Sequence, residues 1–85
     1  MSRKAYVEVA AIFTPEGTIL PQRIRWEDGT LFSVDRITDI RRAAATKAGG
    51  CGLRYTVCIG NRQTYLFLED DRWFVEARDS NTPSA

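Results

Sequence analysis

The sequence predicts an all-β fold, in which a small antiparallel meander of five to six strands curls into an SH3-like or OB-like barrel. Short segments of alternating or β-forming residues follow one another along most of the chain. Residue pairs typical of tight turns, Asp28-Gly29 and Gly60-Asn61, separate some of them. A short meander avoids exposed sheet edges by curling on itself, which favours a barrel. A β-meander with one helix is the alternative.

The length of 85 residues allows one domain, which we expect to span residues 1–77, followed by a flexible tail at residues 78–85. No apolar run approaches the roughly 20 residues of a membrane-spanning helix. The basic residues near Met1 precede no apolar signal region, and Cys51 and Cys58 are too few for a disulfide scaffold. We therefore expect a cytoplasmic protein with no membrane partner.

The first two predicted strands are residues 4–13 and residues 19–27, and each has one strongly apolar face. The residues expected on these faces are Val7, Val9, Ala11 and Phe13 in the first strand and Leu20, Ile24 and Trp26 in the second. The turn at residues 14–17, Thr-Pro-Glu-Gly, has a proline suited to its second position and a glycine that can adopt positive φ. Pro21 fits near the start of a strand because it cannot donate to the ladder.

The third predicted strand is residues 30–42, in which Ile37 and Ile40 break the alternation set by the preceding apolar residues. A β-bulge near Asp35–Arg36 would restore the alternation and bend the strand, as small barrels require. The alternative is a helix in part of residues 38–48, because a capping threonine, a run of alanines and a terminating glycine follow one another there.

Three further strands follow a loop of small residues. Residues 53–59 alternate cleanly, with the apolar face formed by Leu53, Tyr55, Val57 and Ile59. Residues 63–69 are apolar on both faces, which indicates a central or covered strand. Residues 73–77 are expected to form the last strand.

Six short motifs run through most of residues 4–77. They are Trp-Glu-Asp-Gly at 26–29, Val-Asp-Arg-Ile at 34–37, Asp-Ile-Arg-Arg-Ala-Ala at 39–44, Lys-Ala-Gly-Gly at 47–50, Arg-Tyr-Thr-Val at 54–57 and Arg-Trp-Phe-Val-Glu at 72–76. In these motifs the chain resembles a family of small uncharacterised proteins from Firmicutes. The resemblance implies no activity, because that family has no established function.

The sequence offers little for catalysis or metal binding. It contains no histidine, so Cys51 and Cys58 lack a base to activate them and do not make a zinc site. Asp35 and Asp39 could share an acid–base site in principle, but carboxylates on strands more often face solvent or pair with arginines. The glycines around Cys51 lack the Lys-Ser/Thr of a phosphate-binding loop. We therefore expect a non-catalytic protein with no cofactor and no metal.

Basic residues concentrate in the middle of the chain. Residues 22–62 hold eight Lys and Arg against four Asp and Glu, whereas residues 63–85 hold two against five. The candidate binding residues in and around this basic stretch are Arg23, Arg25, Arg36, Arg41, Arg42, Lys47, Arg54, Tyr55 and Arg62. This uneven charge is typical of a binding face or of a self-complementary surface, although arginines paired with nearby aspartates would form an ordinary solvated face.

Two functions fit these observations. The first is a module for protein–protein interaction, including a homo-oligomer that forms through an edge strand. The alternative is binding of single-stranded RNA or DNA, in which arginines contact the backbone and aromatic side chains such as Tyr65 and Phe67 stack on bases. Against stacking, large aromatic residues such as Trp26, Phe32 and Trp73 usually belong to the core.

Overall fold

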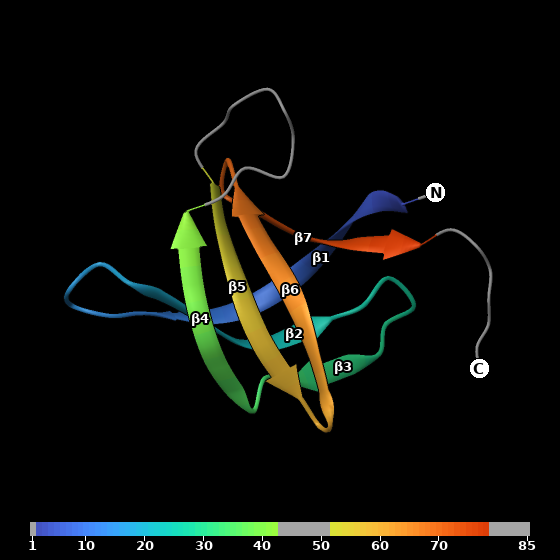
Figure 1. Ribbon diagram of the computed structural model, residues 1–85, viewed down its shortest axis with the longest axis horizontal. Helices are drawn as coiled ribbons and strands as arrows, with labels where there is room; N and C mark the ends of the chain where they lie inside the picture. Colours follow the sequence, from blue (N-terminus) through green and yellow to red (C-terminus); the bar gives the residue numbers. More distant parts are fainter. Residues whose placement is uncertain (1, 43–51, 79–85) are drawn as a thin grey trace.

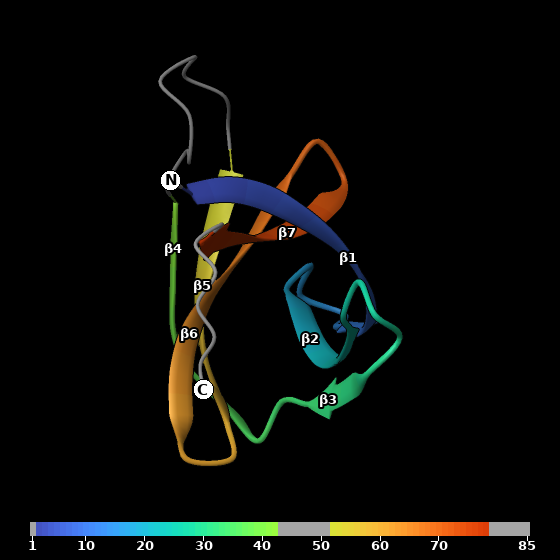
Figure 2. The ribbon, with the colours of Figure 1, turned by 90° about the vertical axis from the view of Figure 1, so that its right-hand side faces the viewer.

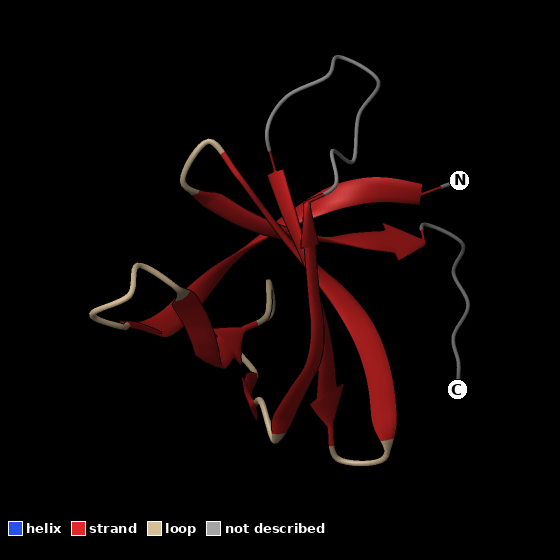
Figure 3. Cartoon of the chain, turned by 60° about the vertical axis from the view of Figure 1, so that its left-hand side comes forward, coloured by secondary structure: helices blue, strands red, loops and turns tan. Residues whose placement is uncertain are grey.

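The computed structural model describes residues 2–42 and 52–78. Within these ranges the chain is all-β, and seven antiparallel strands form one sheet (Figures 1 and 3). The strands are β1 (Ser2–Phe13), β2 (Ile19–Arg25), β3 (Leu31–Ser33), β4 (Arg36–Arg42), β5 (Gly52–Ile59), β6 (Arg62–Glu69) and β7 (Arg72–Arg78). The predicted all-β fold class is confirmed.

The sheet has the strand order β3-β2-β1-β7-β6-β5-β4 and curls into a half-barrel, consistent with a small SH3-like or OB-like barrel. Pairing between β1 and β7 joins the half formed by β1–β3 to the half formed by β4–β6. Figure 2 shows these two halves facing one another. The pairing of β6 with β7 is limited to residues 67–69 and 72–74, beyond which the two strands diverge (Figure 1).

Residues 30–42, predicted as one strand, form the two strands β3 and β4, which lie at opposite ends of the sheet. The backbone N–H of Val34 donates to the carbonyl of Gln22 in β2 (2.9 Å), and the N–H of Asp35 donates to the carbonyl of Cys58 in β5 (2.8 Å). The Asp35 carboxylate also accepts a hydrogen bond from the N–H of Gly60 (2.7 Å). Two consecutive residues therefore carry the chain from one half of the barrel to the other.

At the position where a bulge was expected, near Asp35–Arg36, the chain instead changes its partner strand. A register shift does occur within β4, but it lies between Ile37 and Asp39. Residues 38–42 are strand, so a helix is wrong for that part of residues 38–48. Residues 43–51 lie outside the described residues. The last strand extends to Arg78, one residue past the predicted domain limit, and the remaining tail at residues 79–85 also lies outside them.

The core fills the space between the two halves. Its centre consists of the buried side chains of Ile24, Tyr55, Val57 and Leu66. Half-buried side chains pack against this centre: Val7, Val9, Val34, Ile37, Leu53, Ile59, Leu68, Trp73 and Val75. The apolar face predicted for residues 53–59 is therefore the core face of β5.

The apolar face predicted for residues 4–13 is only partly correct. Val7 and Val9 pack on the core, but Phe13 is 74% exposed. Phe13 ends β1 beside the hairpin loop that projects at the left of Figure 1, away from the strands of the other half. The pairing of β1 with β2 also shifts register between Ala10 and Ala11, opposite the buried Pro21. This irregularity allows a proline, which has no N–H to donate, inside the sheet.

Turns lie at both predicted dipeptides, Asp28-Gly29 and Gly60-Asn61. At Asp28-Gly29, the Asp28 carboxylate accepts a hydrogen bond from the N–H of Thr30 (2.9 Å), and this bond holds the pKa of Asp28 below its usual value. The turn between β6 and β7 has positive φ at both Asp70 and Asp71. Aspartate tolerates this conformation better than most residues, and two such residues suit a tight hairpin.

Val57→Ala should lower the free energy of unfolding by about 2–5 kcal/mol, because it removes methyl groups from a fully buried position. Urea denaturation followed by tryptophan fluorescence measures this change. Phe13→Ala is the matched control and should alter stability by about 0.5 kcal/mol or less. Equal losses for both variants would contradict this placement of the core.

Candidate functional site

The structure distributes the candidate basic residues over several surfaces. Arg23 and Arg25 lie on the outer side of β2, opposite Ala10 and Glu8 of β1. Arg36, Arg41 and Arg54 lie on the outer side of β4 and β5. Arg42 and Arg62 lie on the core side, because they pair with Leu53 and Ile59, which pack on the core. Lys47 lies outside the described residues. The basic middle of the sequence is therefore not one continuous basic face.

Tyr55, included with the arginines as a candidate binding residue, is fully buried. Its hydroxyl donates a hydrogen bond of 2.5 Å to the backbone carbonyl of Ile19, and its ring packs against Trp73 with a centroid separation of 5.4 Å. Burial raises the pKa of the Tyr55 hydroxyl. Tyr55 thus belongs to the core and does not reach a surface ligand.

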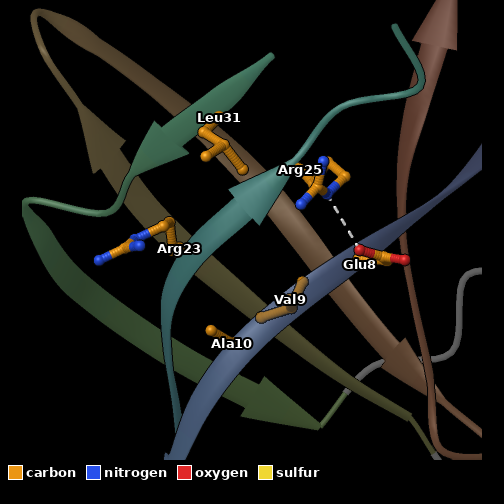
Figure 4. Close-up of a pocket in the computed structure, with 6 residues that line it drawn as sticks. All are labelled: Glu8, Val9, Ala10, Arg23, Arg25 and Leu31. Carbon is orange, nitrogen blue, oxygen red and sulfur yellow. Dashed lines mark ion pairs between the residues drawn. The ribbon is translucent and has the colours of Figure 1, made fainter. Parts of the chain in front are cut away.

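A shallow hollow of about 280 Å³ lies over β1, β2 and β3, beside Arg23 and Arg25 (Figure 4). The guanidinium of Arg25 pairs with the Glu8 carboxylate at 3.1 Å. Arg23 points away from this pair (Figure 4). Because Glu8 neutralises the charge of Arg25, the hollow is not a strongly basic site.

Three arginines on the outer side of β4 and β5, Arg36, Arg41 and Arg54, form together with Tyr65 of β6 what we call the arginine face. Arg41 and Arg54 are directly opposite one another on β4 and β5, and the guanidinium of Arg54 lies 4.6 Å from the ring centroid of Tyr65. The Nε of Arg54 is buried and has no hydrogen-bond partner among the described residues. Arg41 pairs with Asp39 at 2.8 Å, which lowers the net charge of this face.

An aromatic row continues from the arginine face across the sheet, through Phe67, Phe74 and Tyr6. The rings of Phe67 and Phe74 are stacked at 5.1 Å, and Tyr6 meets Phe74 edge-on at 5.6 Å. Phe67 and Phe74 are buried, at 6% and 1% exposure, so their rings are not open for a base to stack on. Arg72 lies 3.7 Å from the ring of Tyr6. Because this contact depends on pairing between the first and last strands, the local sequence pattern gave no sign of it.

The edge strand β4 offers a different kind of surface, which we call the β4 edge (residues 36–42). It is the last strand of the sheet, and in the described part of the chain only β5 pairs with it. Ile40 lies opposite the buried Tyr55 and is itself 38% exposed. The core therefore reaches this edge and ends there with an open apolar side chain.

A groove of about 290 Å³ opens where β6 and β7 diverge. Its apolar wall includes Trp26, Phe32 and Val75, and Arg62 and Glu76 add a positive and a negative group. Trp26 and Phe32 are therefore not the fully buried core residues that the sequence suggested. The alternation of each strand did not reveal the groove, because it forms between strands that are distant in the sequence.

The remaining candidates for chemistry have structural partners. Asp35 holds the turn at Gly60, and Asp39 pairs with Arg41, so the two carboxylates serve different contacts. Cys58 is a free, half-buried thiol on β5, and Cys51 is outside the described residues. Among the described residues, no group of three or more Cys, Asp or Glu is arranged to hold a metal ion. The same residues include no helix with the length and apolar character needed to cross a membrane.

Comparison with known proteins gave no match to a family model, to a curated protein or to a solved structure. The function must therefore be argued from the surfaces described above.

The buried hydroxyl of Tyr55 makes stability dependent on alkaline pH. Burial raises the pKa of Tyr55 above the ordinary value of 10.0. The contribution of the neutral hydroxyl to the free energy of unfolding is therefore fully present below pH 10, and it is lost as the pH rises through the folded-state pKa. Tyr55→Phe should cost about 1–3 kcal/mol at neutral pH, since the Ile19 carbonyl loses its partner, and should flatten the alkaline loss.

Urea denaturation between neutral pH and pH 11 measures both effects. Tyr65→Phe is the control, because it removes an exposed hydroxyl and leaves Tyr55 in place. An unchanged alkaline loss in Tyr55→Phe would show that another group causes it.

Proposed function

We propose that this small SH3-like barrel is a non-catalytic module for protein–protein interaction, and that its partner adds an extended segment to the β4 edge. The observation that carries the proposal is a strand edge that no described strand covers, combined with an exposed Ile40 at the margin of the core. An extended segment bound there would gain main-chain hydrogen bonds and would cover that apolar side chain. Ile37, half-buried on the same side of the strand, continues this apolar margin.

The chemistry of the two sides of β4 indicates what the partner segment contains. Its side chains on the core side would lie beside Ile37 and Ile40, which favours apolar residues. Its side chains on the outer side would lie beside Arg36, Asp39 and Arg41, which favours a charged segment with acidic residues next to the arginines. An alternating apolar and charged strand thus fits the β4 edge best.

Ile40→Lys should weaken binding of such a partner, because a charge at an exposed edge opposes strand addition. Wild-type and variant proteins are used to capture partners from a cell extract, and each captured partner is then purified and titrated by calorimetry. Affinity should fall at least about tenfold for Ile40→Lys, a loss of about 1.4 kcal/mol or more. Amide hydrogen exchange should also slow within residues 36–42 when the partner binds.

The matched control is Ile12→Lys, which introduces the same charge at another exposed isoleucine. It should retain the wild-type affinity. A purified partner that binds both variants equally, or that protects other strands from exchange, would place the site elsewhere.

The second candidate function is binding of single-stranded nucleic acid at the arginine face. The observation that favours it is the direct juxtaposition of Arg41 and Arg54 beside Tyr65, which is 49% exposed and offers a ring for stacking. The ion pairs of Arg25 and Arg41 and the placement of Arg42 and Arg62 on the core side count against it. We therefore favour the protein partner.

If the arginine face binds a nucleic-acid backbone, replacing Arg41 and Arg54 together with alanine should weaken binding and flatten the dependence on salt by about one unit per lost contact. Fluorescence titration of labelled RNA and DNA oligomers at several salt concentrations measures this. The control pair is Arg23→Ala with Arg25→Ala, on the other half of the barrel. Absence of wild-type binding at about 50 mM salt would exclude this function, because even non-specific binders register there.

A further inference from the structure

The β4 edge has a pattern of charge and apolarity that is complementary to itself. Asp39 and Arg41 lie on the outer side of the strand, and Ile40 between them lies on the core side, opposite Tyr55. Asp39 and Arg41 form an ion pair along the strand, and their side chains are 40% and 66% exposed. Because exposed ion pairs contribute little to stability, either residue can exchange this partner for another at small cost.

We propose that two copies of the chain pair through β4 as antiparallel strands, in a twofold-symmetric register centred on Ile40. The inference rests on the proposed use of the β4 edge and specifies its occupant as a second copy. In this register residues 38–42 of the two strands pair, and the two Ile40 side chains meet on the core side. Each Asp39 lies opposite Arg41 of the other copy, on the outer side.

The charges on β4 select this register over its neighbours. Centring the symmetry on Asp39 brings the two aspartates together, and centring it on Arg41 brings the two arginines together, which is unfavourable for residues directly opposite. A shift by one residue sets Asp39 against Ile40, so that an outer-side residue faces a core-side residue. Among these registers, only the one centred on Ile40 satisfies both the faces and the charges.

Charged residues on an edge strand often protect it from pairing. A strand with charges of one sign would repel a second copy in every register. β4 instead places one acid among its arginines, and the same charges that repel in two registers attract in the third. The pattern therefore suits a specific pairing better than general protection.

The paired segment is short beside the interfaces of stable complexes, which bury roughly 1,200–2,000 Å². We therefore expect a dimer that depends on concentration, and sedimentation equilibrium up to about 1 mM protein is suited to detect it. Wild-type protein should show a monomer–dimer equilibrium that weakens between about 0.1 M and 1 M salt, as the facing charges are screened.

Reversing the charge of Asp39 or of Arg41 tests the proposed register directly. Asp39→Lys and Arg41→Glu should each weaken self-association at least about tenfold, because each puts like charges opposite one another at both ends of the register. When the two variants are mixed in equal amounts, they should associate about as well as the wild type. The introduced lysine then lies opposite the introduced glutamate, and the remaining arginine lies opposite the remaining aspartate.

Controls for these variants change the same charges elsewhere. Glu16→Lys, in the turn between β1 and β2, and Arg23→Glu, on the outer side of β2, should dimerise as the wild type does. Circular dichroism and thermal melting establish that each variant is folded before it is centrifuged. Ile40→Lys, which leaves Asp39 and Arg41 unchanged, provides a further variant that should be monomeric.

Three results would overturn the inference. They are a wild-type chain that remains monomeric at about 1 mM, a dimer that neither charge reversal weakens, and reversed variants that do not associate when mixed. A monomeric wild-type chain would leave strand addition by another protein intact, because capture of a purified partner and its loss in Ile40→Lys test that function independently.

Discussion

The barrel depends on Tyr55, which connects its two halves. The hydroxyl reaches from β5 to the carbonyl of Ile19 at the start of β2, and the ring packs on Trp73 of β7. Tyr55 also lies opposite Ile40 on β4 and opposite Leu66 on β6, so a single side chain touches or borders most of the sheet. A buried hydroxyl needs a partner, and the only one that these contacts provide is on the opposite half. Satisfying it requires the sheet to curl.

Tyr55 joins the two halves of the sheet, whereas the change of partner strand at Val34 and Asp35 leaves the sheet with two edge strands. Val34 bonds to β2 and Asp35 to β5, so the segments before and after them become the two terminal strands. One of these, β3, has three residues, and such a short edge is a poor template for pairing. The other, β4, has seven residues and an apolar side chain at its margin. The geometry that closes the core therefore also leaves β4 as the longer edge available to a partner.

The sequence predicted those features that depend on neighbouring residues. Period-two alternation located the core face of β5, and Asp28-Gly29 and Gly60-Asn61 located turns, because both signals act over a few residues. It did not predict features that depend on pairing between distant strands. Phe13 alternates in phase with Val9 but ends up exposed beside the tip of a hairpin. The groove beside Trp26 and the contact of Arg72 with Tyr6 likewise require strands that meet only in the fold.

The arginines illustrate the same limit for the candidate site. Eight cations lie within residues 22–62, but alternation sends neighbouring residues such as Arg41 and Arg42 to opposite sides, and the change of partner strand separates Arg25 from Arg36. A net charge counted along the chain is therefore not a charge on a surface. The order Asp39-Ile40-Arg41 survives this redistribution, because three consecutive residues on one strand keep their alternation wherever the strand is placed. The local pattern of β4 is for this reason better evidence about a partner than the basic composition of the whole segment.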